Sequence, residues 1–230
     1  DTHRRFVIVM QAAMMDLAAF INSRTKEAQP LPHSHARRMF VDMLEAILHM
    51  EAKGCVHGDV KPANVLISVR GLWLLCDLST SVHGSALSRE YATVPGTPFY
   101  IDPRVRVEKK MILGSDTYGL GLTLFFALTR IVLTCEFHDG AFLDCKKWGY
   151  GETARKFLTH ILDESDSTRK NWNKESLSKL EWMREGLACR DAAFKVKIRR
   201  NDGCDSTALN GSSLFSDPNP DPVSTPVVEN

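Results

Sequence analysis

The segment Cys55-Val56-His57-Gly58-Asp59-Val60-Lys61-Pro62-Ala63-Asn64-Val65-Leu66 and the shorter Cys76-Asp77-Leu78-Ser79 after it decide how this chain is interpreted. Together they place an Asp, a Lys, an Asn and a second Asp in a fixed order between apolar flanks. Phosphoryl transfer needs a carboxylate to orient the attacking hydroxyl, a cation near the transferred phosphate and oxygen ligands for Mg²⁺. Each residue alone could be a turn former or a solvated surface residue, but the four in this order favour phosphoryl-transfer chemistry.

These two segments resemble the catalytic loop and the metal-binding motif of eukaryotic-type serine/threonine protein kinases, which read His-Arg-Asp-x-x-x-x-Asn and then Asp-Phe-Gly. The resemblance implies that Asp59 is the catalytic base and that Lys61 stabilises the γ-phosphate of ATP. Asn64 and Asp77 would hold Mg²⁺ through hard oxygen ligands, as this ion requires. His57 would have a structural role, and the substrate would be a protein hydroxyl.

The resemblance also assigns the adenine side of the site, near the start of the chain. Phe6–Met10 resembles the last strand of the small lobe, with Met10 in the gatekeeper position. Gln11 to Ala13 would form the hinge, whose backbone binds adenine, and Leu66 would pack beneath the adenine ring. Asp16 would contact the ribose, although an Asp at the start of a helix is equally explained as a cap for the helix dipole.

Farther along, Val94-Pro95-Gly96-Thr97-Pro98-Phe99-Tyr100-Ile101-Asp102-Pro103 resembles the segment that closes the kinase activation loop and meets the substrate. By this resemblance Thr97 bonds toward the base and the catalytic Lys, and the segment favours a protein substrate over a small molecule. Asp116 matches the buried Asp that braces the catalytic loop. A buried carboxylate must find donors, so we expect Asp116 to bind the backbone of that loop.

Besides the mild exchange of Phe for Leu78 in the metal motif, three positions depart from the family pattern. Gly58 replaces the Arg before the base, so we expect any activity to depend little on phosphorylation of the activation loop. Ser79 replaces the Gly of the metal motif, which removes backbone freedom. Arg104 stands where the family has a Glu that pairs with a later Arg, and the matching position is Lys195. The ion pair is therefore expected to be lost, which would loosen the substrate-binding loop.

From Asp1 onward the chain shows no match to the glycine-rich phosphate loop, the strand Lys or the helix Glu that the family places before this strand. We interpret the chain as a fragment of a longer kinase or an incomplete gene model, with a natural remnant as the third possibility. The alternative function is a catalytically inactive pseudokinase lobe that acts as a scaffold or binding module. For the chain by itself we expect low stability and little transfer, because a lone small-lobe strand would have an unpaired edge.

The composition is that of an ordinary globular domain, with 43% hydrophobic and 25% charged residues among 230. The 29 basic and 28 acidic residues nearly cancel, so neither nucleic acid nor a membrane is an expected partner. The six cysteines are scattered and typical of reduced core thiols, and we expect no signal peptide at the start of the chain. We expect an intracellular protein, in the cytoplasm, with a nuclear location left open.

Three weaker patterns have competing explanations. His33-x-His35 could bind a metal, but it lacks a nearby third ligand and solvated histidines are favoured. The basic run Lys195–Arg200 could be a nuclear signal, although a solvated helix end is the commoner case. Ser88 and Thr93 are possible phosphorylation sites without a charge partner in the sequence.

The patterns together predict an α+β, protein-kinase-like fold, with a mostly helical C-terminal lobe, short β-hairpins and only the last strand of the N-terminal lobe. Residues 1–200 would form this partial kinase domain, and the polar residues 201–230 a disordered tail. The expected helices are Met14–Ile21, a helix capped by Ser34 that ends near Gly54, Ser115–Thr129, Glu152–Leu162, Lys174–Leu187 and Asp191–Arg199. The expected strands are Phe6–Met10, Val65–Ser68 and Leu72–Cys76.

Overall fold

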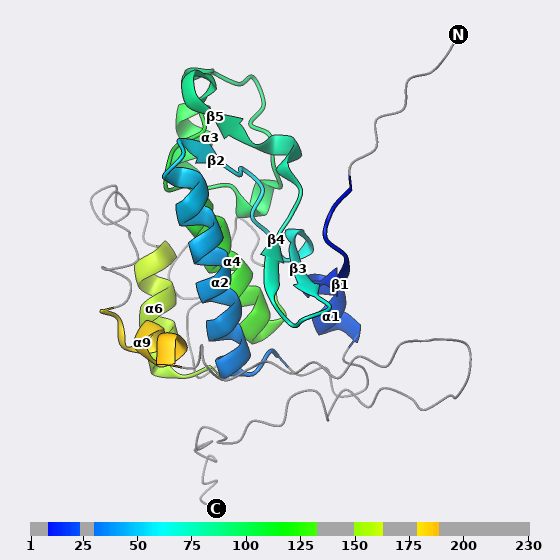
Figure 1. Cartoon of the computed structure of the whole chain (residues 1–230). Coiled ribbons are helices and arrows are strands. Elements are labelled where there is room, and N and C mark those ends of the chain that lie inside the picture. The colour runs from blue at the N-terminus through cyan, green and yellow to red at the C-terminus, as the bar shows by residue number, and fades with distance from the viewer. Residues whose placement is uncertain (1–8, 24–29, 133–149, 163–178, 189–230) are drawn as a thin grey trace, which may run out of the picture.

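The computed structural model describes residues 9–23, 30–132, 150–162 and 179–188. Within them, helices form the larger part, and two small antiparallel sheets lie beside and above the helices (Figure 1). The helices are α1 (Leu17–Ser23), α2 (His33–Glu51), α3 (Pro103–Glu108), α4 (Asp116–Thr129), α6 (Glu152–Leu162) and α9 (Glu181–Ala188). The strands are β1 (Ala13–Asp16), β2 (Cys55–Val56), β3 (Val65–Ser68), β4 (Trp73–Leu75) and β5 (Val82–His83).

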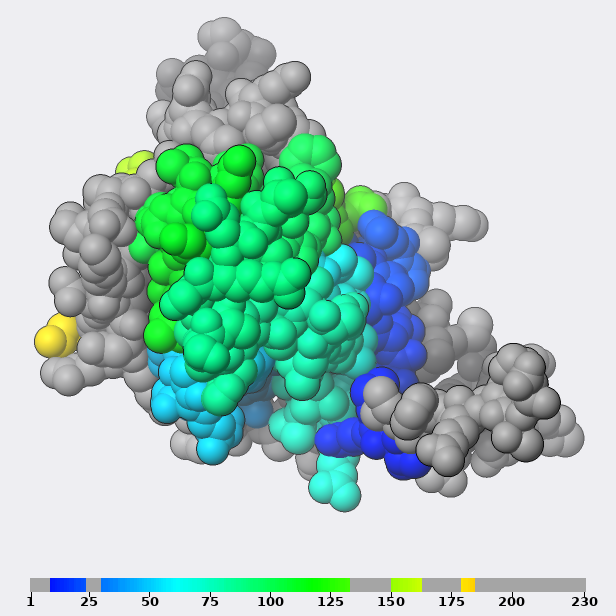
Figure 2. Space-filling view, turned by 90° about the horizontal axis from the view of Figure 1, so that it is seen from above, coloured from blue at the N-terminus to red at the C-terminus, as the bar shows by residue number. Residues whose placement is uncertain are grey.

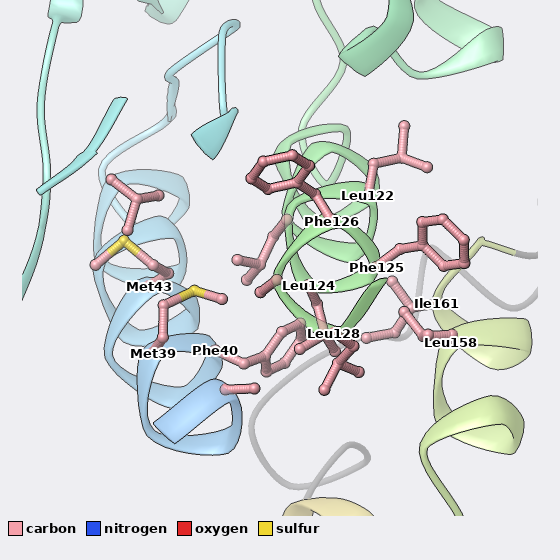
Figure 3. Packing of buried hydrophobic residues seen from close by; sticks show 14 of the residues in the cluster. Met39, Phe40, Met43, Leu122, Leu124, Phe125, Phe126, Leu128, Leu158 and Ile161 are labelled. Carbon is pink, nitrogen blue, oxygen red and sulfur yellow. The ribbon is translucent and has the colours of Figure 1, made fainter. Parts of the chain in front are cut away.

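Most of the buried apolar side chains lie between α2, α4, α6 and α9, and we call this cluster the helical core. Helix α2 contributes residues at intervals of three and four, so one broad face is buried. Helix α4 is buried on all sides from Asp116 to Leu128. Figure 3 shows side chains of α2, α4 and α6 meeting between the three helices, Phe40 and Ile161 among them.

Two glycines weaken the helix propensity of α4, and the structure gives each of them a packing function. A Cβ at Gly119 would lie 2.6 Å from the Val60 carbonyl oxygen, so this turn of α4 contacts the catalytic loop backbone directly. A Cβ at Gly121 would lie 2.5 Å from Cγ2 of Ile161 in α6. The close approach of these neighbours is possible only because both positions lack a side chain.

The larger sheet has the order β1-β3-β4, and the smaller sheet pairs β2 with β5. Strands β3 and β4 form the predicted hairpin, in which Gly71 turns the chain with a φ of 74°. The two-residue strands β2 and β5 were not predicted, nor was α3. Because β2 immediately precedes His57, its pairing with β5 fixes where the catalytic loop begins.

The prediction for the start of the chain was partly wrong. Residues 14–16 were expected to be helical, but they belong to β1, in which Met15 pairs with Ile67 of β3. The helix begins only at Leu17, because the carboxylate of Asp16 accepts a hydrogen bond of 2.8 Å from Ala19 N. Residues 6–8 of the expected first strand lie outside the described residues, and Val9 and Met10 are not in a strand.

The other helix predictions agree with the structure where they fall on described residues. Helices α4 and α6 occupy the expected positions, whereas α2 begins at His33 after Pro32, without a cap bond from Ser34. Of the helix expected at Lys174–Leu187 the described part begins at Glu181, and Asp191–Arg199 and the tail lie outside the described residues. None of the helices in the described part of the chain is long and apolar enough to cross a membrane.

Candidate active site

The catalytic loop is held from below by the first residue of α4. The carboxylate of Asp116 accepts hydrogen bonds from the backbone N–H groups of His57, at 2.7 Å, and Gly58, at 2.9 Å. Asp116 is buried with 4% of its surface exposed, and this burial raises its pKa above the ordinary range of an Asp. The two donors compensate for taking this carboxylate out of water, and they fix the backbone one residue before Asp59.

His57 connects this loop to the segment that carries Asp77. Its ring is fully buried; Nδ1 accepts a hydrogen bond from Asp59 N at 3.3 Å, and Nε2 lies 2.9 Å from the carbonyl oxygen of Cys76. Because Nδ1 is the acceptor, the proton must be on Nε2, which donates to Cys76. The hydroxyl of Thr80 also donates to the His57 carbonyl at 2.9 Å. The structural role expected for His57 therefore has a geometric basis here.

Asp59 is the centre of a compact polar cluster. Its Oδ2 lies 2.7 Å from Nζ of Lys61, and its Oδ1 accepts a hydrogen bond of 2.8 Å from Thr97 N. The ammonium of Lys61 also donates to Oγ1 of Thr97 at 2.7 Å, which closes a triangle of Asp, Lys and Thr. Asn64 donates from Nδ2 to the Asp59 carbonyl at 2.8 Å and to Oδ2 at 3.1 Å.

The charge state of Asp59 follows from two opposed effects. Burial raises the pKa of the carboxyl, while hydrogen bonds from Lys61 and Thr97 and the Lys61 charge lower it by more. The net pKa lies below the usual value of an Asp, so the group is ionised at neutral pH. An ionised carboxylate held in one orientation by three donors can accept a hydrogen bond from a hydroxyl.

Asp77 lies across from this cluster on an exposed turn. Its backbone is left-handed, with a φ of 67°, and its Oδ1 accepts a hydrogen bond of 3.2 Å from Ser79 N. Hydrogen bonds from Ser79 lower the pKa of Asp77, which keeps the group ionised. Asp59, Lys61 and Asn64 thus lie on the loop before β3, Asp77 lies just after β4, where Cys76 N donates to the Asn64 carbonyl, and Thr97 joins them from a third segment.

Asn64 and Asp77 fit a magnesium site in their chemistry. The Nδ2 of Asn64 is committed to Asp59, which leaves Oδ1 as the atom for a metal, and the Asp77 carboxylate is exposed. Mg²⁺ is usually held by one or two protein carboxylates together with waters and substrate phosphates. Among the described residues no group of three or more His, Cys, Asp or Glu could hold a metal by itself, so phosphate oxygens would have to complete this site.

The expected adenine side is only partly assembled. Ala13 and Asp16 lie on β1 and Leu66 on β3, where Asp16 and Leu66 are register partners. Met10 is 73% exposed, so the structure does not place the expected gatekeeper in a pocket, and Gln11 is exposed as well. Asp16 caps α1, which is the structural alternative to a ribose contact.

Comparison with known proteins agrees with this geometry. Residues 1–183 match the family model described as the protein kinase domain. The chain belongs to the protein kinase family. The predicted kinase-like fold class and the resemblance to the protein kinase family are therefore confirmed.

Its relatives include plant kinases. "Putative CBL-interacting protein kinase 13" of Oryza sativa subsp. japonica is 27% identical over 186 residues, which cover 76% of this chain and 35% of the relative. "CBL-interacting protein kinase 4" of the same plant is 28% identical over 224 residues, covering 85% and 48%. "CBL-interacting serine/threonine-protein kinase 18" of Arabidopsis thaliana is 25% identical over 206 residues, covering 80% and 39%. The chain thus spans less than half the length of these relatives.

Gly58 distinguishes this kinase domain from the family pattern in a way that the structure explains. Its φ is +80°, and a Cβ there would lie 3.0 Å from both Cε of Met111 and the Thr80 carbonyl oxygen. A Cβ at Gly96 would in turn lie 2.4 Å from the Gly58 carbonyl oxygen. The segment that carries Thr97 therefore packs backbone to backbone on the catalytic loop, in space that a side chain at 96 would fill, whereas a side chain at 58 would meet Met111 and Thr80.

The predicted loss of the ion pair between Arg104 and a later basic residue stays a prediction, but Arg104 does have an ion-pair partner within its own segment. Nη2 of Arg104 lies 2.8 Å from Oδ2 of Asp102, two residues earlier. Lys195, the expected partner position, lies outside the described residues. Sequence analysis missed Asp102 because it was considered only as part of the motif; the signal was an acidic and a basic residue flanking the Pro that opens a helix.

Proposed function

We propose that this kinase domain transfers the γ-phosphate of MgATP to serine or threonine hydroxyls of protein substrates. The observation that carries the proposal is the Asp59–Lys61–Thr97 triangle, with Asn64 donating to the same carboxylate from the other side. An ionised Asp held this way can accept the hydrogen bond of an incoming hydroxyl and then its proton. Orientation and charge are the main contributions that a protein makes to this reaction.

Each residue of the cluster has a defined task in this proposal. Lys61, with its side chain 24% exposed, already binds Oδ2 of Asp59 and supplies positive charge beside the hydroxyl acceptor. Thr97 donates its N–H to Oδ1 and so keeps the carboxylate from rotating. Mg²⁺, when bound by Asn64 and Asp77, would neutralise charge on the phosphate oxygens. Asp116 and His57 act indirectly, because they position the backbone of the catalytic loop that carries Asp59.

The proposal is tested by magnesium-dependent transfer from labelled ATP to a generic protein substrate. The protein is expressed from the coding sequence that contains this chain together with any segment encoded upstream of Asp1. Asp59→Asn and Asp77→Ala are expected to lower the rate by about 100-fold or more, because general-base and charge terms are lost. Asp42→Asn, which breaks the Arg38–Asp42 pair on α2 away from the site, is the matched control and should retain the rate.

A second candidate is the pseudokinase scaffold, and one observation favours it. The Ser79 N–H donates to Oδ1 of Asp77 at 3.2 Å, so a metal has only Oδ2 and one lone pair of Oδ1 left at this carboxylate. A folded protein that binds nucleotide but transfers no phosphate, in the wild type as in Asp59→Asn, would establish this alternative. The alignments cover under half of each relative, so the CBL interaction in their names is assigned to those relatives alone.

A further inference from the structure

A buried ion pair lies at the start of α3, just beyond the segment that carries Thr97. The Asp102 carboxylate is bound by Arg104 through Nη2 at 2.8 Å and through Nε at 3.2 and 3.3 Å, and it also accepts a bond of 2.9 Å from Arg104 N. The side chain of Asp102 is 0% exposed and that of Arg104 is 12% exposed. One carboxylate thus caps the helix and neutralises a guanidinium at the same time.

This pair is linked to the active site through a short stretch of chain. Starting from the catalytic loop, Gly96 lies against the Gly58 carbonyl, and Thr97 binds both Asp59 and Lys61. Next, the Tyr100 carbonyl lies 3.3 Å from the Cβ position of Gly119 on α4. Asp102 follows two residues later and lines a small cavity of about 20 Å³ together with Gly58 and Asp116. The segment is therefore bonded to the catalytic loop at Thr97, and at its other end the buried Asp102, which is bonded to Arg104, lies beside Gly58 and Asp116.

The ion pair differs from the other charges on α3. Arg106, in the last turn of the same helix, is exposed, and an exposed charge contributes little to local order. Removing one member of a buried pair instead leaves a charge without its partner in a site closed to water. Figure 2 views the face on which this part of the chain lies, where green residues form a continuous surface.

We propose that Arg104 is a positioning residue for phosphoryl transfer, because its bonds to Asp102 hold the segment 96–102 and so keep Thr97 on Asp59. The anchor is local: the two partners are separated by a single residue, Pro103. The expected effect of Arg104 on catalysis rests on the proposed kinase function. Its expected effect on the order of residues 96–102 does not.

The test compares Arg104→Met with Arg106→Met in the protein used for the transfer assay. Loosening the segment that meets the substrate and positions Asp59 is expected to lower kcat/KM for a protein or peptide substrate by about 10-fold to 100-fold in Arg104→Met, given how strongly positioning affects rate. The affinity for MgATP should be unchanged, since Asn64 and Asp77 are not part of this segment. Arg104→Lys keeps the charge and one donor and should recover part of the loss.

Amide hydrogen exchange tests the same inference without any enzymatic activity. The Thr97 N–H, which is donated to Asp59, should exchange at least 10-fold faster in Arg104→Met than in Arg106→Met, while amides of α2 and α4 keep their rates. Should Arg104→Met fail to fold, Asp102→Asn keeps an oxygen for the helix cap and loses the charge. Unchanged exchange at Thr97 would overturn the inference whatever the activity. Faster exchange in a protein without transfer would support it and contradict the proposed function instead.

Discussion

The helical core and the loop cluster differ in what they hold together. The helical core joins five helices and the β3–β4 hairpin through large side chains such as Phe40, Phe157 and Trp182. The loop cluster consists of Val56, Val82, Val105 and Met111, with half-buried neighbours that include Tyr91 and Val94. It joins elements of two to six residues above the catalytic loop (Figure 1).

This difference indicates that global stability and local order are separable in this kinase. Contacts in the helical core are lost only when the whole unit unfolds, whereas a small cluster over short elements can open by itself. Asp59 lies between the helical core and the loop cluster: its loop is bound to α4 through Asp116 and to the segment 96–102 through Thr97. The catalytic geometry therefore depends on both regions at once.

The largest expected effect comes from the helical core. Phe40 is fully buried, with ring centroids of Phe157 and Trp182 at 5.0 and 6.1 Å. Phe40→Ala should lower the free energy of unfolding by about 3–5 kcal/mol, because it leaves a cavity among rings that cannot close it. Phe99→Ala, at a side chain that is 41% exposed, is the matched control and should change unfolding by under about 1 kcal/mol. Equal effects of the two substitutions in urea denaturation would contradict the dominant contribution of the helical core to global stability.

A smaller and more local effect is expected from the loop cluster. Met111 is 4% exposed, and its Cε lies 3.0 Å from the position of a Cβ on Gly58. Met111→Ala should cost about 2 kcal/mol in the local stability of this cluster, the low end for such a truncation. Hydrogen exchange should show this at Tyr91, whose N–H binds the Lys109 carbonyl at 2.9 Å. Leu113→Ala, at a residue 47% exposed, is the control; uniform acceleration across α2 and α4 would argue against separate opening.

The smallest expected effect is a dependence of stability on pH. Burial, followed by the charge of Asp116, raises the pKa of Glu51 to about 7, although a hydrogen bond from Gly114 N opposes this. The folded state therefore binds a proton that the unfolded chain releases above the ordinary pKa of 4.5. Stability should fall as pH rises from about 4.5 to about 7 and then level off.

Glu51→Gln tests this expectation because it keeps an oxygen for Gly114 and removes the charge. The variant should be more stable than the wild type at pH 8, by roughly 1 kcal/mol after allowance for partial exposure, and the slope between the two pKa values should be reduced. Thermal unfolding of both proteins at pH 5 and pH 8 measures it. Parallel curves for the two proteins would show that Glu51 does not carry this slope.

How much could be predicted from the sequence depended on how far apart the interacting residues lie along the chain. The polar residues of the catalytic loop and the β3–β4 hairpin were predictable, because each depends on neighbours within a few positions. Strand β2 was not, since two residues give no period and its partner Val82 is far along the chain. Residues 14–16 were assigned to a helix on propensity, which the pairing with β3 overrides.

The candidate site shows the same limit. The order of Asp59, Lys61, Asn64 and Asp77 indicated the chemistry, and the resemblance indicated the bonds of Thr97 to Asp59 and Lys61, but neither indicated that Asn64 would donate to Asp59. The packing of Gly96 on Gly58 could not be inferred either, because a glycine in a sequence does not reveal which backbone approaches it.

The two glycines of α4 have different consequences for how this domain can change over generations. The neighbours of Gly121 are the side chains of Ile161 and Leu162, so a larger residue at 121 can be accommodated by a smaller one on α6. The neighbours of Gly119 include the carbonyl oxygens of Val60 and Tyr100, which are backbone atoms and cannot be removed by a substitution at those positions. A substitution in α4 can therefore be compensated by a second substitution where α4 contacts α6, but not where it contacts the backbone of the catalytic loop.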